Sequence, residues 1–264
     1  MKGGNVMTTR KQKKALMIAG ITVLSLAFLM AASFLPTLWL ENGGMSKMQG
    51  TWVNVYYETQ ENAAKEVFEL AEERAQRLTE ELGITGREFI NIYIYDSQFT
   101  FQTKKYGLIG PMLGLDWYIG DNRGTNVLLT SPANPGRVHG YEECRDAGLH
   151  EMVHAYNSVL NPKMQLWLNE GVALYLSGGA PPSDWYASGK PPSLEDIQTG
   201  DPVKFSNIGG YYYAYTYVEY LDKTYGWDKV LALLRGADCG TVFQASEKDL
   251  YTGWLDYLKS NCSI

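Results

Sequence analysis

Two of the chain's three histidines, His150 and His154, lie four residues apart in the segment His-Glu-Met-Val-His. Residues at this spacing share one face of an α-helix, one turn apart, so a helix here directs both imidazoles at one point. Zinc accepts nitrogen and oxygen ligands tetrahedrally, and a catalytic zinc keeps one position for water. Glu151 follows the first histidine and is placed to take a proton from that water. The pentapeptide therefore predicts a helix that carries a catalytic metal site.

The surrounding residues favour that helix. The segment before the motif, residues 142–147, contributes acidic side chains to a first turn, where the helix dipole stabilises negative charge. Asn161 precedes Pro162, and a residue before proline is disfavoured in helical geometry. The sequence predicts a helix from about residue 142 to residue 160.

A third candidate ligand, Glu170, follows His154 by 16 residues in the apolar stretch 166–176. A carboxylate is costly to bury in such a stretch unless it is paired or binds a metal ion. A structural interpretation stays open for both segments. The histidines can be satisfied within an amphipathic helix, and Glu170 can lie on the solvated face of a second helix.

These two segments together resemble the gluzincin metallopeptidases over residues 147–178. The resemblance is nearest to the aminopeptidase N and leukotriene A4 hydrolase group and more distant to thermolysin, and it rests on the pentapeptide and on Trp167-Leu168-Asn169-Glu170-Gly171-x-Ala173-x-Tyr175. It implies that His150, His154 and Glu170 bind Zn²⁺ and that Glu151 is the general base of peptide hydrolysis. The spacing to the glutamate is a few residues shorter than in aminopeptidase N, as in small bacterial peptidases of the same clan.

The resemblance extends more weakly to residues 209–225, which are rich in tyrosine. Gluzincins of this group place a tyrosine near the start of a later helix, where its hydroxyl stabilises the oxyanion. Tyr211 aligns with that position, and Tyr212 and Tyr213 are close enough in sequence to compete with it. A tyrosine-rich core helix is the alternative interpretation.

One element of the aminopeptidases, the Gly-x-Met-Glu-Asn segment that holds the substrate's free amine, has no counterpart between residues 106 and 137. We expect residues 124–131 to take its place as an edge strand that pairs with an extended peptide or protein substrate. This difference favours an endopeptidase over an aminopeptidase.

The N-terminal region predicts a membrane anchor. Residues 1–14 hold five basic and no acidic side chains, and residues 15–40 hold no charge at all. A bilayer core needs about 20 apolar residues in a helix, whereas the apolar region of a signal peptide has about 7–15. Cleavage after Ser33 remains an alternative. The basic flank puts the N-terminus in the cytoplasm and the catalytic domain outside, in a single-pass protein of the cell membrane.

Charge and cysteine content narrow the partners further. The chain carries a net charge of −6, and without its first 14 residues the balance is 18 basic against 29 acidic side chains, or −11. Such a surface does not attract nucleic acid. Cys239 and Cys262 are candidates for a disulfide, and Cys144 for a buried thiol.

We expect the chain to divide into four regions. The last region is expected to have an α+β, zincin-like fold, with a small N-terminal sheet followed by helices. They are a basic segment (1–14), a transmembrane anchor (15–40), a stalk (41–50) and the metallopeptidase domain (51–264). Within the domain, strands are expected at 52–57, 89–95, 115–119 and 126–130, and helices at 61–82, 97–106, 142–160, 227–235 and 248–259.

Two other functions fit the same residues. One is a zincin-fold binding or scaffold protein without turnover, against which the intact Glu151 argues. The other is a zinc hydrolase of a non-peptide bond, since fold and metal site do not fix the substrate. His139 and residues 180–189 are expected to be a surface histidine and a connecting loop.

Overall fold

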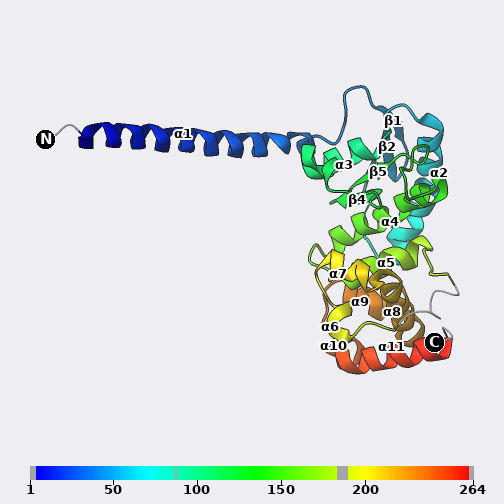
Figure 1. Ribbon diagram of the computed structural model, residues 1–264. Coiled ribbons are helices and arrows are strands. Elements are labelled where there is room, and N and C mark those ends of the chain that lie inside the picture. Colours follow the sequence, from blue (N-terminus) through cyan, green and yellow to red (C-terminus); the bar gives the residue numbers. More distant parts are fainter. Residues whose placement is uncertain (1–3, 87, 183–189, 262–264) are drawn as a thin grey trace.

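The computed structural model describes residues 4–86, 88–182 and 190–261 (Figure 1). A long N-terminal helix, α1 (Gly4–Ser33), leads through a 3-10 turn, η1 (Leu35–Leu38), into an α+β body. The body has a sheet with flanking helices at one end and a bundle of helices at the other. The expected loop at 180–189 and the disulfide partner Cys262 fall wholly or largely outside the described residues.

Five strands form one mixed sheet in the order β1-β2-β3-β5-β4. They are β1 (Ser46–Gln49), β2 (Val53–Tyr57), β3 (Ile90–Tyr95), β4 (Gly120–Arg123) and β5 (Asn126–Thr130). The three central strands run parallel, and β1 and β4 pair antiparallel at the two edges. Parallel strands need cover on both faces, and this sheet has it.

Alternation along the strands sends side chains to two separate clusters. Val55, Ile92 and Val127 join the main core with the helices α2 (Glu61–Glu81) and α4 (Tyr141–Leu160). Tyr95 and Leu128 point to the other face, where they pack with Phe101 of α3 (Gln98–Tyr106). A second 3-10 segment, η2 (Gly107–Met112), packs against α3.

After β5, the regular elements among the described residues are all helices. The helices following α4 are α5 (Leu166–Ser177), α6 (Leu194–Ile197), α7 (Pro202–Asn207), α8 (Gly210–Tyr225), α9 (Trp227–Leu234), α10 (Cys239–Phe243) and α11 (Glu247–Asn261). Helix α4 contacts β4 and β5 on one side and α5 on the other, so it joins the sheet to the helical half. Its N-terminus is fixed by the carboxylate of Glu143, which accepts a 2.8 Å hydrogen bond from the Gly140 N–H.

The predicted elements are largely confirmed, including the helix with the histidine motif and its end at Asn161. The sheet edges differ from expectation. The stalk at 41–50 contains β1, because Ser46–Gln49 pairs with the free edge of β2. The strand expected at 115–119 begins instead at Gly120, and β5 is an inner strand because β4 covers its outer edge.

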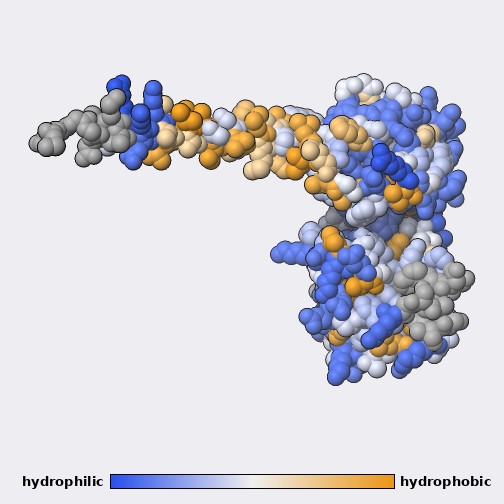
Figure 2. Space-filling model, viewed as in Figure 1, coloured by the Kyte–Doolittle hydropathy of each residue, from blue (hydrophilic) through white to orange (hydrophobic). Residues whose placement is uncertain are grey.

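The N-terminal helix extends away from the body, and its surface is hydrophobic along most of its length (Figures 1 and 2). Within Thr9–Leu38, an 18-residue stretch has a mean hydropathy of 2.3 and no buried residue, so by length and composition this segment can cross a membrane or act as a signal sequence. Its regular helix ends at Ser33, earlier than the expected residue 40. Pro36 disfavours helical geometry at Leu35, and the chain tightens into η1.

Close packing of α5 on α8 depends on Gly171. A Cβ built at this position would lie 2.5 Å from the carbonyl oxygen of Ala214 and 2.8 Å from Val218 Cγ2. No side chain can approach a backbone oxygen so closely, so only glycine permits this separation of the two helices.

Replacement of Gly171 by alanine is therefore expected to push α5 away from α8 and to destabilise the fold by about 1–3 kcal/mol, the usual cost of overpacking a core. Denaturant unfolding of the full chain measures this loss. The control is Gly20→Ala on α1, where nothing lies within 4 Å of the new methyl group. Equal stability of the two variants would contradict the packing argument.

Candidate metal centre

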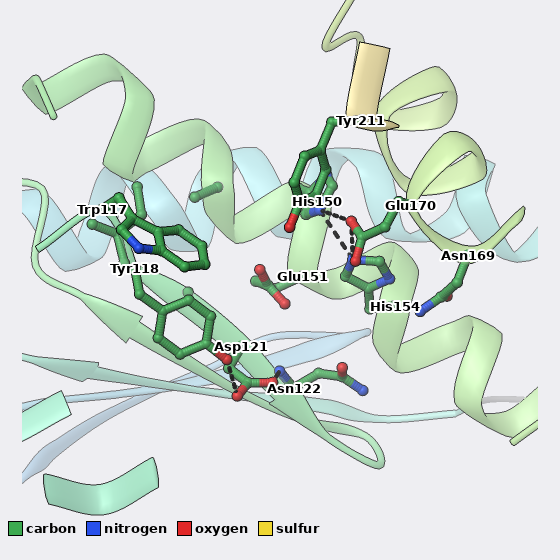
Figure 3. Close-up of a pocket in the computed structure, with 13 residues that line it drawn as sticks. Trp117, Tyr118, Asp121, Asn122, His150, Glu151, His154, Asn169, Glu170 and Tyr211 are labelled. Atoms are coloured by element: carbon green, nitrogen blue, oxygen red, sulfur yellow. Dashed lines mark hydrogen bonds and ion pairs between the residues drawn. The ribbon is translucent and has the colours of Figure 1, made fainter. Parts of the chain in front are cut away.

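Helices α4 and α5 bring together the three predicted ligands. His150 and His154 come from α4 and Glu170 comes from α5 (Figure 3). The two histidine Nε2 atoms lie 3.0 Å apart, and Glu170 Oε2 lies 3.3 Å from each of them. One ligand atom from each of the three residues can be chosen so that all three atoms lie within 4.8 Å of one another.

These separations fit a metal ion. An ion bound tetrahedrally at about 2.0–2.1 Å holds its ligands about 3.3 Å apart, which matches the spacing of the three atoms here. Two imidazole nitrogens and one carboxylate oxygen also form a donor set suited to zinc. The residues present can therefore hold a metal ion such as zinc.

Burial and charge make the three residues interdependent. Their side chains are 19%, 7% and 14% exposed for His150, His154 and Glu170, respectively. Burial opposes the ionised form of Glu170, but the two imidazoles outweigh it and hold its pKa well below the usual range. Burial likewise disfavours the charged form of His154, yet Glu170 and Glu151 outweigh it and raise its pKa to about 9. Burial and the neighbouring His154 lower the pKa of His150.

Glu151 lies in the same cleft, between the three ligands and the sheet (Figure 3). Its side chain passes over Gly120 of β4: a Cβ there would lie 2.8 Å from Glu151 Cγ and 3.1 Å from Oε1. Burial raises the pKa of Glu151 to about 8, and the charge on His154 opposes this rise. The glycine therefore provides the space that this carboxylate occupies.

Tyr211 is the tyrosine of the three candidates that lines the cleft. It lies in the first turn of α8, and Figure 3 shows its hydroxyl directed into the cleft beside His150. Burial, with the charges of Glu170 and Glu151, raises its pKa above the usual range. Tyr213 instead packs against Trp254 in the core, with ring centroids 5.9 Å apart, and Tyr212 is not among the residues lining the cleft.

The wall opposite the helices was not predicted from the sequence. This wall consists of β4 and the preceding loop. The cleft between the wall and the helices has a volume of about 450 Å³. Asp121 on this wall pairs with Lys105 and accepts a hydrogen bond from the Tyr118 hydroxyl. Trp117 and Asn122 also line the cleft. Only the pairing of β4 with β5 brings these residues to the site, and no local sequence signal marks them.

The remaining candidates lie outside the ligand cluster. His139 Nε2 is 2.8 Å from the carbonyl oxygen of Trp117, and its other ring nitrogen is 3.4 Å from Glu143. Cys144 is a fully buried free thiol, as predicted, and burial raises its pKa to about 12. Cys239 is half-buried in α10.

Comparisons with known proteins give a limited likeness. No protein-family model matches the chain, and neither does any curated protein. Among solved structures, leukotriene A4 hydrolase from Saccharomyces cerevisiae aligns at 16% identity with a TM-score of 0.45. The alignment covers 83% of this chain and 36% of the hydrolase, so the chain spans about a third of that protein's length. The function proposed below rests on the residues of the site itself.

Zinc added to the metal-free protein is expected to raise the midpoint of thermal unfolding, since binding to the folded state alone stabilises it by about 2.7 kcal/mol at a hundredfold excess over Kd.

Glu170→Gln removes the charged ligand and is expected to weaken zinc affinity. The loss should exceed the roughly 10–100-fold typical of residues that hydrogen-bond to a metal ligand without touching the metal.

The matched control for this substitution is Glu69→Gln. Glu69 pairs with Lys65 at 3.7 Å on the exposed face of α2, far from any ligand in sequence, and its side chain is 62% exposed. Titration calorimetry with zinc compares the two variants. Unchanged affinity in Glu170→Gln would show that the three residues do not form the binding site.

Proposed function

We propose that this chain is a membrane-anchored zinc peptidase that hydrolyses internal peptide bonds outside the cytoplasm. The observation that carries the proposal is the placement of Glu151 beside the His150, His154 and Glu170 cluster, in a cleft whose other wall is the edge strand β4. This arrangement combines a metal site, a candidate base and a strand edge for an extended chain.

Substrate binding is assigned to β4. The strand pairs with β5 along one edge, and it is the last strand of the sheet as described. An extended peptide can add to such an edge through backbone hydrogen bonds, while side-chain pockets give the specificity. The observed strand order moves this role from residues 124–131 to β4, whose residues 120–122 line the cleft.

Zinc held by His150, His154 and Glu170 would supply Lewis acidity, which polarises the scissile carbonyl and makes water a stronger nucleophile at neutral pH. Glu151 accepts the proton of the attacking water and returns it to the leaving amine. Burial raises the pKa of Glu151 to about 8 in the metal-free protein, and the charge of a bound cation would lower it toward the ionised form that accepts a proton. The Tyr211 hydroxyl donates a hydrogen bond to the oxyanion.

The anchoring part of the proposal rests on α1. The five basic residues among positions 1–14 and the absence of charge along residues 15–40 support an N-terminus in the cytoplasm and a body on the other side of the membrane. The net negative charge of the body disfavours binding to nucleic acid.

Glu151→Gln is the primary test. It keeps the size of the side chain and removes the base, so we expect peptide cleavage to fall by about 10²–10⁴-fold with zinc content unchanged. The assay is cleavage of a mixed peptide library by the full chain in detergent, with mass spectrometry of the products. Zinc binding without internal cleavage by the parent protein would refute the peptidase proposal and favour a binding role or another hydrolysable bond.

Tyr211→Phe tests the oxyanion role. Loss of a hydrogen bond that forms only in the transition state is expected to lower kcat by about 10²–10³-fold and to leave KM nearly unchanged. Tyr212→Phe is the adjacent control, because that residue does not line the cleft. If both variants keep full kcat, Tyr211 has no catalytic role.

Gly120→Ala tests the position of the base. The new methyl group would displace the Glu151 carboxylate, and a shift of about 1 Å can cost about 100-fold in rate. Zinc affinity should be retained, because the atoms nearest to the added Cβ all belong to Glu151 and not to the three candidate ligands. Gly200→Ala serves as the control, since nothing lies within 4 Å of its added Cβ. Kinetic assays that show equal kcat for the two variants would contradict this placement.

A further inference from the structure

Large apolar side chains are exposed where α1 meets the body. They belong to η1, to η2 and to the residues that directly follow each, and we call them the η1–η2 surface: Leu35 (50% exposed), Leu38 (66%), Trp39 (63%), Leu108 (58%), Ile109 (44%), Met112 (84%) and Leu113 (50%). Residues 107–115 contain no charged side chain. A soluble surface rarely concentrates so many large hydrophobic residues in two adjacent segments.

The two segments are packed together. Helix η1 contacts both α3 and η2, and α1 also contacts η2. Gly107, the first residue of η2, has a positive φ of 77°, and a Cβ there would collide with the carbonyl oxygen of Ser33 at the end of α1. The end of α1 and the start of η2 therefore approach as closely as two backbones can.

Hydrogen bonds tie the chain leaving α1 to the body. Lys104 Nζ donates to the carbonyl oxygen of Trp39 at 2.7 Å, and the Tyr95 hydroxyl donates to that of Leu40 at 2.8 Å. The guanidinium of Arg123, at the end of β4, donates to the carbonyl oxygen of Thr37. Lys104 and Tyr95 are buried, so these contacts hold the exit segment on the body rather than leaving it as a flexible link.

The length of α1 sets the depth of this surface. Nineteen helical residues from Ala15 to Ser33 carry no charge and span about 28 Å, close to the roughly 30 Å of a bilayer core. If these residues cross the membrane, η1 and Trp39 come at its outer interface. Tryptophan is the residue type that prefers this depth.

We propose that the η1–η2 surface lies in the outer interface of the bilayer that α1 crosses, so that the body rests on the membrane. The proposal depends on the proposed anchoring of α1. Lipid is the occupant because η1 follows the apolar helix α1 directly in the chain, and η2 packs against both α1 and η1 (Figure 2). If α1 lies in the hydrocarbon core, the apolar side chains just beyond its C-terminal end lie at the boundary between that core and the lipid headgroups.

The attraction is apolar rather than electrostatic. The nearby basic side chains have partners within the protein: Lys104 binds Trp39, Lys105 pairs with Asp121, and Arg123 binds Thr37. The body also carries a net negative charge. Seating is therefore expected on neutral phosphatidylcholine as well as on anionic lipid, with little dependence on salt.

This seating would bring the cleft close to the membrane. Trp117, which lines the cleft, follows Leu113 by four residues, a reach of at most about 14 Å. The substrates that meet the cleft most readily would be polypeptide segments just outside the bilayer.

The experiment uses the full chain in phosphatidylcholine vesicles, with its three cysteines replaced by alanine and single nitroxide labels introduced at Leu24, Met112 or Val203. Leu24 lies in α1, and Val203 is an exposed apolar residue of α7 in the helical half (66% exposed). Relaxation of each label by oxygen, which partitions into lipid, is compared with relaxation by an aqueous nickel chelate. We expect oxygen to dominate at Leu24 and Met112 and the nickel chelate to dominate at Val203.

Other outcomes overturn the proposal in distinguishable ways. If oxygen relaxes the Leu24 label more strongly and the nickel chelate relaxes the Met112 label more strongly, α1 is anchored but the body stands away from the lipid. Stronger relaxation of the Leu24 label by the nickel chelate would refute the membrane anchor itself, and with it the placement of the η1–η2 surface in the bilayer interface. Protection of Met112 from both reagents, with dipolar broadening between labels, would mean that a second copy of the chain covers the surface.

A charge substitution provides the matched variant. Leu108→Asp places a carboxylate on the η1–η2 surface, and a label at Leu113 is expected to gain access to the nickel chelate while a label at Leu24 keeps its lipid signature. Val203→Asp adds the same charge to the helical half and is expected to change neither label. No gain at Leu113 would overturn the proposal.

Discussion

The carboxylate of Glu170 is the contact on which the arrangement of this protein depends. It is buried between α4 and α5 and lies 3.3 Å from two histidines of α4. Because a buried carboxylate is stable only beside positive charge or a metal ion, electrostatics as well as packing fixes α5 against α4. The next residue, Gly171, sets the approach of α5 to α8. Two consecutive residues therefore determine both the ligand cluster and the position of Tyr211 beside it.

The site divides into a part that sequence can predict and a part that it cannot. The histidines and Glu151 were predictable because a helix repeats locally, and Glu170 because a carboxylate in an apolar stretch needs a partner. The opposite wall depends on which strands pair, a property of residues far apart in the chain. The antiparallel pairing of β4 with β5 places Gly120 against the side chain of Glu151, whereas the sequence predicts a strand at 115–119.

The N-terminal region shows the same limit from another side. The length of the uncharged segment is enough to predict a helix able to cross a membrane, because this property depends only on the residues of the segment itself. The following residues are polar and rich in glycine, a composition typical of a flexible stalk. Ser46–Gln49 nevertheless becomes a strand because β2 offers it an edge, and partners distant in sequence bind the carbonyl groups of Trp39 and Leu40. Local composition does not record such contacts.

Strand β4 links these two regions of the molecule. Its first residue, Gly120, faces the Glu151 carboxylate, and its last, Arg123, holds the chain that leaves α1. Four residues of antiparallel strand span only about 13 Å. Because this strand contacts both Glu151 and the segment that follows α1, it cannot shift without moving both of them. The geometry thus couples the orientation of the cleft to the orientation of α1, which a stalk of the same length would have left independent.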